Sequence, residues 1–429
     1  MSLAVHRRAD HLFGRVPMTW MTQWSGGFPL ALASARGNKV TDVDELTYID
    51  FALGDTGAMA GHSPEPTVRA VTQRMAALGG ISAMLPTEDA EWVAEELTRR
   101  FGLTQWSFTL SATDANRWAV RLARLATGKS KLLVFSYCYH GSVDETLVIV
   151  GPDGQPMSRP DNVAPGVDPT VTTRVAEWND LAAVERELAH GDVAAILMEP
   201  ALTNIGIVLP EPGFHEGLRA LATKYGALLM IDETHTISAG PGGMTARDGL
   251  RPDIFVIGKS IGGGIPCGAY GLSEEVASTV RENVGAIGLG DVGGVGGTLA
   301  GNALSSAAMR ATLGEVLTDS AFANMIEMAT RYTGHVEQII VDAELPWSIA
   351  QLGARAEYRF VRPGPRNGGE SAAAADHELD EYMHLFTLNR GIIMTPFHNM
   401  ALMCPVTSVA DVDHHSEIFA EAVAELVGR

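Results

Sequence analysis

Lys259 stands just after an apolar run, residues 253–257, and just before three glycines, Gly262 to Gly264. A lysine at the end of a buried strand lies close to apolar walls, where burial disfavours the ammonium form. A lysine in its free amine form can make a Schiff base with a carbonyl compound. The glycines leave the backbone room to approach a bulky group. The pattern predicts covalent carbonyl chemistry at Lys259, against the alternative of a solvated lysine in a flexible loop.

Asp232 ends the preceding apolar run, 27 residues before Lys259 (259 − 232 = 27). An isolated buried carboxylate is costly, so Asp232 needs a partner. A protonated pyridine nitrogen is such a partner, and protonation of that nitrogen makes pyridoxal 5′-phosphate (PLP) a strong electron sink. Lys259 and Asp232 together predict a PLP enzyme with the cofactor held as a Schiff base. The competing interpretation of Asp232 is a helix cap or a structural ion pair.

An anion site is expected at Ser111-Ala112-Thr113, between a predicted strand and a predicted helix. Free N–H groups at a helix N-terminus attract anions, so we assign this turn to the cofactor phosphate. An ordinary Ser or Thr helix cap is the alternative. Thr298, in a glycine-rich stretch, is a second hydroxyl that could reach a phosphate.

Further polar and aromatic residues follow other apolar runs. Tyr139, before His140 and Gly141, could stack on a flat cofactor, although a lone tyrosine is more often part of the core. Glu199 and Asn204 follow the run 193–198 and could orient the cofactor ring or its ring oxygen.

Short apolar runs alternate with amphipathic helical stretches from about residue 104 to residue 300, which predicts an α/β fold with a mostly parallel sheet. Ligands of such sheets bind beyond the carboxyl ends of the strands, where the polar residues above stand. We expect an N-terminal segment (1–60) that joins a small domain, a large cofactor domain (61–300) and a C-terminal small domain (301–429). Residues 151–173 are predicted to form a surface loop, and the apolar runs comprise residues 106–110, 131–136, 193–198, 227–231, 253–257 and 269–272.

The composition narrows the classes of function. The chain has 31 basic and 51 acidic residues and a net charge of −20, which disfavours binding to nucleic acid or anionic membranes. Three distant cysteines indicate neither a disulfide framework nor a zinc site, and the histidines lack metal-site spacing. No apolar stretch is long enough for a signal peptide or a membrane span, so we expect a cytoplasmic protein without metal.

The motifs together resemble the class III aminotransferases, PLP enzymes of fold type I, near the branch of glutamate-1-semialdehyde aminomutases and β-amino-acid aminotransferases. The resemblance runs from about residue 28 to the C-terminus and is strongest over residues 228–271. SATDAN, YHG, the Glu199-Pro200 pair and GGTLAGN follow in the family's order. It implies a seven-stranded type of sheet in the large domain and a smaller α+β domain. It also implies a homodimer with active sites at the interface, where Thr298 reaches the partner's cofactor and Lys259 shuttles a proton during turnover.

Departures from the family bear on cofactor and substrate. Thr234 stands where a small apolar side chain normally presses on the cofactor, and Ala112 and Asp114 replace Gly and Glu. Trp20 and Phe397 stand where β-amino-acid aminotransferases carry arginines. Arginine is the natural partner of a carboxylate, so its absence predicts a pocket for an uncharged, apolar amine.

We therefore expect an aminotransferase that uses amines with ketones or aldehydes, through aldimine and ketimine intermediates on Lys259. The open alternatives are an aminomutase, a β-amino-acid aminotransferase, a PLP lyase or racemase-like enzyme, and a non-catalytic member of the fold. His235 and most other histidines are expected to be ordinary hydrogen-bonded or surface residues, with His140 the exception because of the YHG match.

Overall fold

A computed structural model describes residues 1–287 and 293–428, and the chain divides into two compact units. Unit 1 comprises residues 1–64, 319–364 and 374–429, and unit 2 comprises residues 65–318 and 365–373. Unit 2 extends past the boundary expected at residue 300 because α10 (Ala303–Ala311) packs on α2 (Glu65–Gln73) and α3 (Glu88–Phe101). Seven of the nine residues of α10 are buried there.

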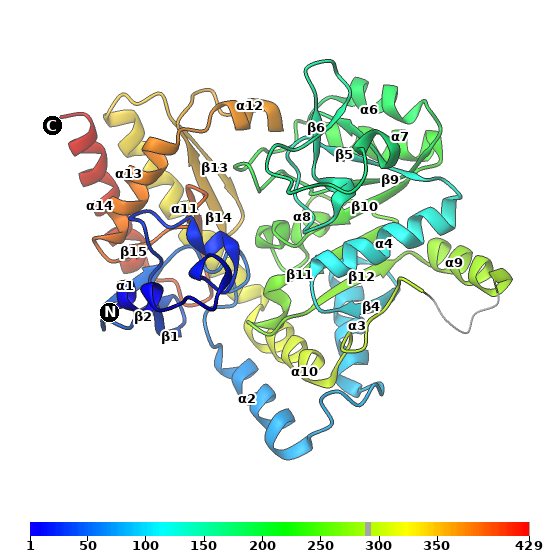
Figure 1. Ribbon diagram of the computed structural model, residues 1–429, viewed down its shortest axis with the longest axis horizontal. Coiled ribbons are helices and arrows are strands. Elements are labelled where there is room, and N and C mark those ends of the chain that lie inside the picture. The colour runs from blue at the N-terminus through cyan, green and yellow to red at the C-terminus, as the bar shows by residue number, and fades with distance from the viewer. Residues whose placement is uncertain (288–292, 429) are drawn as a thin grey trace. The chain divides into compact units, whose positions relative to one another are not determined.

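Unit 2 is built on a seven-stranded sheet with the order β4-β12-β11-β10-β9-β5-β8 (Figure 1). β12 runs antiparallel to its neighbours β11 and β4, whereas the pairs from β11 to β8 are parallel. The expected mostly parallel sheet is therefore confirmed. Its strands are β4 (Gln105–Thr109), β5 (Lys131–Phe135), β8 (Thr173–Ala176), β9 (Val193–Met198), β10 (Leu228–Asp232), β11 (Ile254–Gly258) and β12 (Gly268–Leu272).

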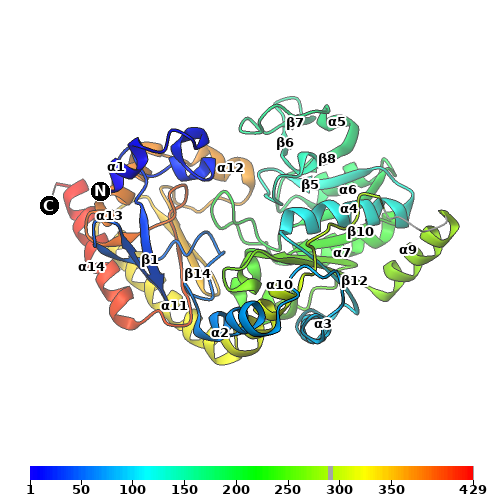
Figure 2. The ribbon, with the colours of Figure 1, turned by 60° about the horizontal axis from the view of Figure 1, so that its bottom comes forward.

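Helices cover this sheet, which explains its continuous apolar strands. α4 (Ala112–Thr127) packs on β9 to β12 and is capped by Gly128 in the left-handed conformation. Figure 2 shows α4 beside β10. Every residue of β9, β11 and β12 is buried. The other helices of unit 2 include α6 (Leu181–Leu188), α7 (Phe214–Tyr225), α8 (Gly243–Arg247), α9 (Glu274–Ile287) and α12 (Gly368–Ala373).

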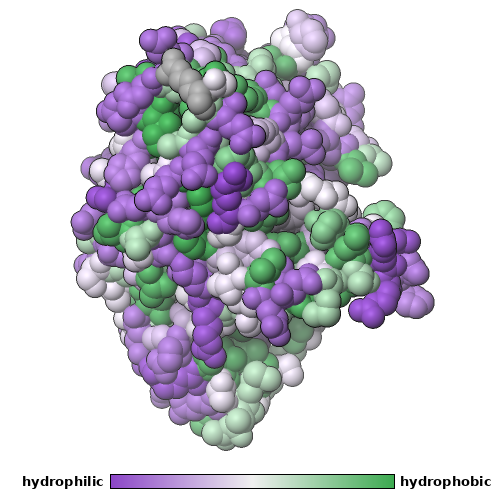
Figure 3. Space-filling model, turned by 90° about the vertical axis from the view of Figure 1, so that its left-hand side faces the viewer, coloured by the Kyte–Doolittle hydropathy of each residue, from purple (hydrophilic) through white to green (hydrophobic). Residues whose placement is uncertain are grey.

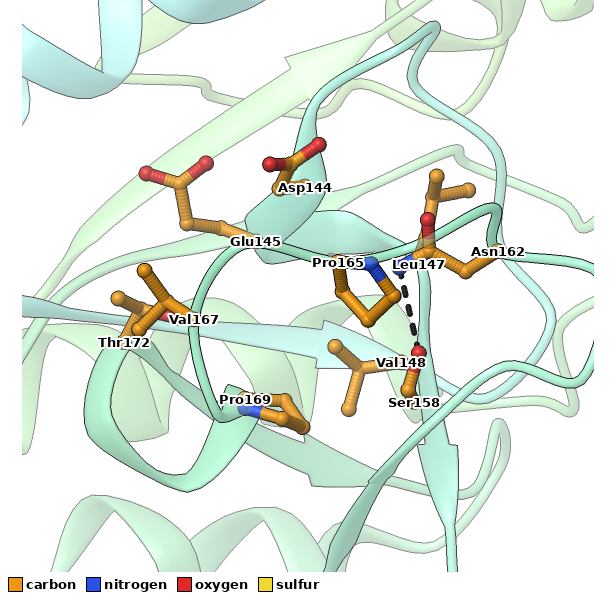
Figure 4. Close-up of a pocket in the computed structure, with 10 residues that line it drawn as sticks. All are labelled: Asp144, Glu145, Leu147, Val148, Ser158, Asn162, Pro165, Val167, Pro169 and Thr172. Atoms are coloured by element: carbon orange, nitrogen blue, oxygen red, sulfur yellow. Dashed lines mark hydrogen bonds between the residues drawn. The ribbon is translucent and has the colours of Figure 1, made fainter.

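Residues 151–173, predicted to form a loop, contain more structure than expected. β7 (Pro156–Ser158) pairs with β6 (Val148–Val150), and α5 (Pro169–Thr172) leads directly into the edge strand β8. These elements have only three or four residues each, which is too short for a helix or strand period to be recognised in the sequence. Residues between Asp144 and Thr172 line a cavity of about 140 Å³, where Asn162 Nδ2 donates to Ser158 Oγ at 3.2 Å (Figure 4).

Unit 1 contains two small sheets and several helices. One sheet has the order β1-β2-β3-β15 and the other β13-β14-β16. α11 (Asp319–Asp342) packs against α14 (Val409–Leu426) and against β13 and β14. The remaining elements are α1 (Ser2–Arg7), η1 (Phe13–Arg15), η2 (Thr19–Thr22), β1 (Leu32–Arg36), β2 (Lys39–Asp42), β3 (Thr47–Asp50), β13 (Ser348–Leu352), β14 (Arg355–Arg359), α13 (His377–Leu388), β15 (Ile392–Ile393) and β16 (Met400–Leu402).

Hydrophilic residues cover much of the face in Figure 3, with hydrophobic residues interspersed. Among the helices of residues 1–287 and 293–428, none has the length and apolar character needed to span a bilayer.

Candidate active site

Two neighbouring parallel strands bring the predicted lysine and aspartate to one edge of the sheet. Asp232, the last residue of β10, lies opposite Val256 of β11, and Lys259 follows the end of β11. Lys259 has a φ of +51°, in the left-handed region, which costs roughly 1–2 kcal/mol for a residue other than glycine. Such strain is often found at functional sites. The Nζ of the half-buried Lys259 lies 2.7 Å from Nε2 of His235.

Asp232 is 3% exposed, and both of its carboxylate oxygens have partners. Oδ2 accepts a hydrogen bond from Asn116 Nδ2 at 2.8 Å and lies 3.0 Å from His140 Nδ1, while Oδ1 accepts from the Thr234 amide at 3.0 Å. Burial acts to raise the pKa of Asp232, but the bonds from His140, Thr234 and Asn116 hold it below 3.8. Asp232 is therefore an anion in the protein interior.

His140 carries the matching positive charge. Its ring is 1% exposed, and burial acts to lower its pKa. The neighbouring Cys138 sulfur and the Asp232 carboxylate act in the opposite direction and raise the pKa of His140 to about 10. Because His140 stabilises the anionic form, Asp232 is suited to hold a protonated ring nitrogen.

The turn predicted to bind phosphate forms the start of α4. Ser111 is the N-cap, and its Oγ accepts from the Asp114 amide at 3.2 Å and lies 3.1 Å from Asp114 Oδ2. Ala112 packs against the end of β11, because a Cβ added at Gly258 would lie 3.0 Å from its Cβ. Ser111 thus acts as a helix cap, and the first turn of α4 begins at the position where the sequence predicts a phosphate site.

The loop after β5 closes over the same helix end. Thr113 Oγ1 accepts from the Ser142 amide at 3.3 Å. Gly141 has a φ of +80°, and a Cβ there would lie 2.0 Å from Thr113 Oγ1. This contact permits only glycine at position 141, and it joins the YHG segment to the start of α4.

Tyr139 and Glu199 are brought together, and Asn204 lies in the same region of the chain. The amide of the half-buried Tyr139 donates to Glu199 Oε1 at 3.2 Å, and Glu199 Oε2 accepts from the Thr203 hydroxyl. Burial raises the pKa of Glu199. Asn204 is half-buried in the turn between the bridged residues Leu202 and Val208. In this structure Glu199 holds the backbone at Tyr139.

The other predicted site residues lie apart from this cluster in the sequence. Trp20 in η2 and Phe397 both belong to unit 1, and their rings meet edge to face with centroids 5.8 Å apart. The structure therefore joins the two residues of the predicted substrate pocket. Thr298 belongs to unit 2 and is exposed.

Two residues that the sequence analysis left without a role have clear ones here. Asn116 binds Asp232 directly, and it could have been noticed as the last residue of SATDAN. Glu233 is fully buried, and it accepts hydrogen bonds from the amides of Thr245 at 2.5 Å and Met244 at 3.3 Å. Glu233 therefore caps α8 and links this helix to the end of β10.

Several buried polar atoms at these strand ends have no hydrogen-bond partner within the described chain. They are Thr234 Oγ1, Ser260 Oγ, Asn116 Oδ1 and His140 Nε2. An unsatisfied buried polar group costs about 1–3 kcal/mol, so polar ligand atoms within reach would stabilise this region. The residues present fit PLP: a lysine for its aldehyde, an anionic carboxylate for its ring nitrogen and a helix N-terminus for its phosphate. Fold and site define a PLP-dependent enzyme of fold type I.

Comparison with known proteins gives the family. Residues 20–424 match the sequence model of the family "Aminotransferase class-III", and the chain belongs to this family. It is 33% identical over 405 residues to a glutamate-1-semialdehyde 2,1-aminomutase of Roseiflexus castenholzii, covering 93% of this chain and 89% of that protein.

Two solved structures are similar over nearly the whole chain. A glutamate-1-semialdehyde-aminomutase from Pseudomonas aeruginosa is 46% identical with a TM-score of 0.96, over 99% of this chain and 94% of that chain. An omega-transaminase from Sphaerobacter thermophilus is 27% identical with a TM-score of 0.88, over 98% and 97% of the two chains. The chain is thus similar to both an aminomutase and a transaminase.

Proposed function

We propose that this PLP enzyme transfers an amino group from an amine without a nearby carboxylate to a ketone or an aldehyde. The observation that carries the substrate preference is the contact of the Trp20 and Phe397 rings, 5.8 Å apart. These two aromatic residues replace arginines of the β-amino-acid branch, and an aromatic surface favours an apolar group over a carboxylate.

The roles of the chain's own residues follow from the site. Lys259 attaches the cofactor and, once released, moves the proton at the reacting carbon. Asp232, held anionic by His140, keeps a proton on the ring nitrogen, and the bound cofactor then supplies the electron sink. Tyr139 provides a stacking surface, and Thr234 places a hydroxyl where the family has an apolar contact.

The phosphate contacts complete these assignments. Ser111, Ala112 and Thr113 supply the amides and hydroxyls of the α4 N-terminus for the phosphate. Glu199 and Asn204 orient the ring and its oxygen, Glu199 through its bond to the Tyr139 amide.

An aminomutase is the second candidate, supported by the names of the Roseiflexus and Pseudomonas relatives. Both reactions need the same lysine and aspartate. They differ in the substrate, because an aminomutase returns the amino group to the same molecule and consumes no separate ketone or aldehyde.

We further propose a cytoplasmic homodimer in which Thr298 of one subunit reaches the phosphate site of the other. The exposure of Thr298 in the single chain supports this arrangement, because a partner could reach it. Three buried free cysteines are consistent with a reducing compartment.

A titration of the purified protein with amino donors tests the proposed reaction. The donors are alanine, glutamate, a β-amino acid, isopropylamine and 1-phenylethylamine, and the readout is loss of the visible band of lysine-bound cofactor. We expect the simple amines to bleach the band and the amino acids to leave it, because no arginine is expected to hold a carboxylate. Lys259→Ala should lose the band and slow turnover by at least about 100-fold, the usual scale of a lost proton-transfer group.

Other outcomes give different conclusions. Bleaching by a carboxylated donor alone would contradict the apolar pocket. Conversion of an amino-aldehyde without any oxo acceptor would establish the aminomutase. Normal turnover by Lys259→Ala would remove the lysine mechanism altogether.

A further inference from the structure

His235 lies beside the cofactor lysine and has no role in the function proposed above. Its Nε2 is 2.7 Å from Lys259 Nζ, which is hydrogen-bond distance, and the residue is only 5% exposed. It stands between Thr234 and the short helix η5 (Thr236–Ala239), 24 residues before the lysine. From its sequence context alone, His235 is expected to be an ordinary hydrogen-bonded histidine.

The backbone holds both partners of this contact in place. On the histidine side, the Glu233 amide donates to Val256 O at 2.9 Å, and the Ile237 amide donates to Glu233 O at 3.0 Å. The buried Glu233 side chain is in turn bound to the start of α8. His235 therefore sits in a segment anchored on either side.

The segment that carries Lys259 is also constrained. Lys259 has its left-handed φ at the start of η6 (Lys259–Gly262), and Gly263 ends that turn with a φ of +57°. A Cβ at Gly263 would lie 2.5 Å from Thr312 Oγ1 and 2.8 Å from Thr67 Oγ1. The contact between His235 and Lys259 thus joins two constrained segments and is built into the site.

A lysine can take a proton from carbon only when its nitrogen has a lone pair, and an ammonium has none. An imidazole with its proton on Nδ1 has a lone pair on Nε2 and can accept a proton at neutral pH. We propose that His235 accepts a proton from Nζ of released Lys259 and so keeps this amine ready for proton transfer. One N–H bond on Nζ breaks, one forms on Nε2, and the positive charge moves to the imidazole. The reverse step returns the proton.

This inference rests on the proposed function, because it needs Lys259 to be the lysine that attaches PLP. His235 acts through Lys259 and is a positioning residue for its proton. Asp232, His140, Glu199 and Glu233 titrate or carry charge at the same strand ends, and they are unchanged in the variants below.

The test compares His235→Gln with wild type and with the control His215→Gln. Glutamine can place a hydrogen-bonding nitrogen near the position of Nε2 but cannot take up the proton. His215, on α7, is another buried histidine of unit 2, and its Nε2 lies 2.8 Å from Pro200 O. Each apoprotein is mixed with PLP, and growth of the visible band reports attack by the Lys259 amine without any substrate.

At pH 7 we expect His235→Gln to attach PLP at least about tenfold more slowly than wild type, a conservative size for general-base assistance. The deficit should shrink as the pH rises to 9.5, because hydroxide then removes the lysine proton. His215→Gln should match wild type throughout. In turnover with an α-deuterated amine, His235→Gln should lower kcat with little change in KM.

Two outcomes would overturn the inference: equal attachment rates, or a deficit that does not change with pH, which indicates only a structural contact. If His235→Gln melts far below wild type, His235→Ala with added imidazole is used in its place. We then expect the rate of PLP attachment to recover in proportion to the imidazole concentration. No recovery there would also overturn the inference. Lys259→Ala is measured in parallel, so failure of the lysine assignment remains distinguishable.

Discussion

At the level of single residues, the site depends on a charged pair held away from water. Asp232 and His140 are 3% and 1% exposed, and their contact at 3.0 Å is supported by Asn116. A buried ion pair is weak evidence for stability, because desolvation offsets much of the attraction. Its value here is chemical, since it keeps a negative charge on Asp232, the proposed partner of the cofactor nitrogen.

The pair predicts a pH-dependent stability of the cofactor-free protein. The pKa of His140 is raised from 6.5 to about 10, so its contribution is complete below pH 6.5 and is lost as the pH rises toward 10. The pKa of Asp232 is lowered from 3.8, so its contribution is complete above that value and is lost at lower pH. We expect the stability advantage of wild type over His140→Asn to fall between pH 6.5 and pH 10, as measured by denaturant unfolding.

His215 offers a control, because its effect on stability should change with pH in the opposite direction. Burial lowers its pKa, so it disfavours folding at acidic pH, where the unfolded chain is protonated. The wild-type advantage over His215→Asn should therefore rise as the pH passes upward through 6.5. A pH-independent difference for His140→Asn would show that His140 carries no charge.

At the level of elements, the proposed phosphate site depends on how the loop after β5 meets the start of α4. Gly141 and Thr113 make this junction, because only a residue without a Cβ fits over the threonine hydroxyl. Gly128 ends the same helix with a similar φ of +68°, but nothing lies within 4 Å of the position of its missing Cβ. Substitutions at the two glycines therefore distinguish the effect of backbone strain from that of a steric clash.

We therefore predict different outcomes for alanine at these two positions. Both Gly141→Ala and Gly128→Ala should lose about 1–2 kcal/mol of stability from the left-handed φ. Gly141→Ala should lose more and should also bind PLP at least about tenfold more weakly, since ten in affinity is about 1.4 kcal/mol. Denaturant unfolding and a PLP titration measure the two effects. Equal PLP affinity for both variants would exclude the junction from cofactor binding.

At the level of the whole molecule, the residues proposed for the cofactor and those proposed for the substrate belong to different compact units. The cofactor cluster belongs to unit 2, and the Trp20–Phe397 ring pair belongs to unit 1. Thr298 is exposed in the single chain, although it is proposed to contact the cofactor phosphate. A second copy of the chain is the proposed explanation, and mixed dimers can test it.

Mixing two variants that are each defective in PLP binding should restore binding if the subunits share their sites. Thr298→Asp places a negative charge toward a phosphate and should weaken PLP binding at least about tenfold in the homodimer, because like charges in contact cost several kcal/mol. Lys259→Ala should abolish attachment. Mixed dimers of the two should contain one intact site, which a PLP titration with absorbance detection measures as about half the wild-type sites. No recovery in mixed dimers, confirmed by mass, would place Thr298 in the cofactor site of its own subunit or outside it.

The sequence by itself determined the sheet and its chemistry to a large extent. The apolar runs became β4, β5, β9, β10, β11 and β12, because a strand buried on both faces needs an unbroken apolar run. The same rule located Asp232 and Lys259 at the ends of strands, because the end of an apolar run can be recognised from local sequence alone. It failed over residues 151–173, since β7 and β8 are too short to show a period.

Only the tertiary structure decided which side chains meet. Asn116 reaches Asp232 across 116 positions of sequence, and His235 reaches Lys259 across 24. Such contacts depend on the order of strands in the sheet and on left-handed backbone turns, and neither follows from the pattern of any one segment. Local periodicity fixes where a strand ends, whereas packing between strands selects the neighbours of the residue found there.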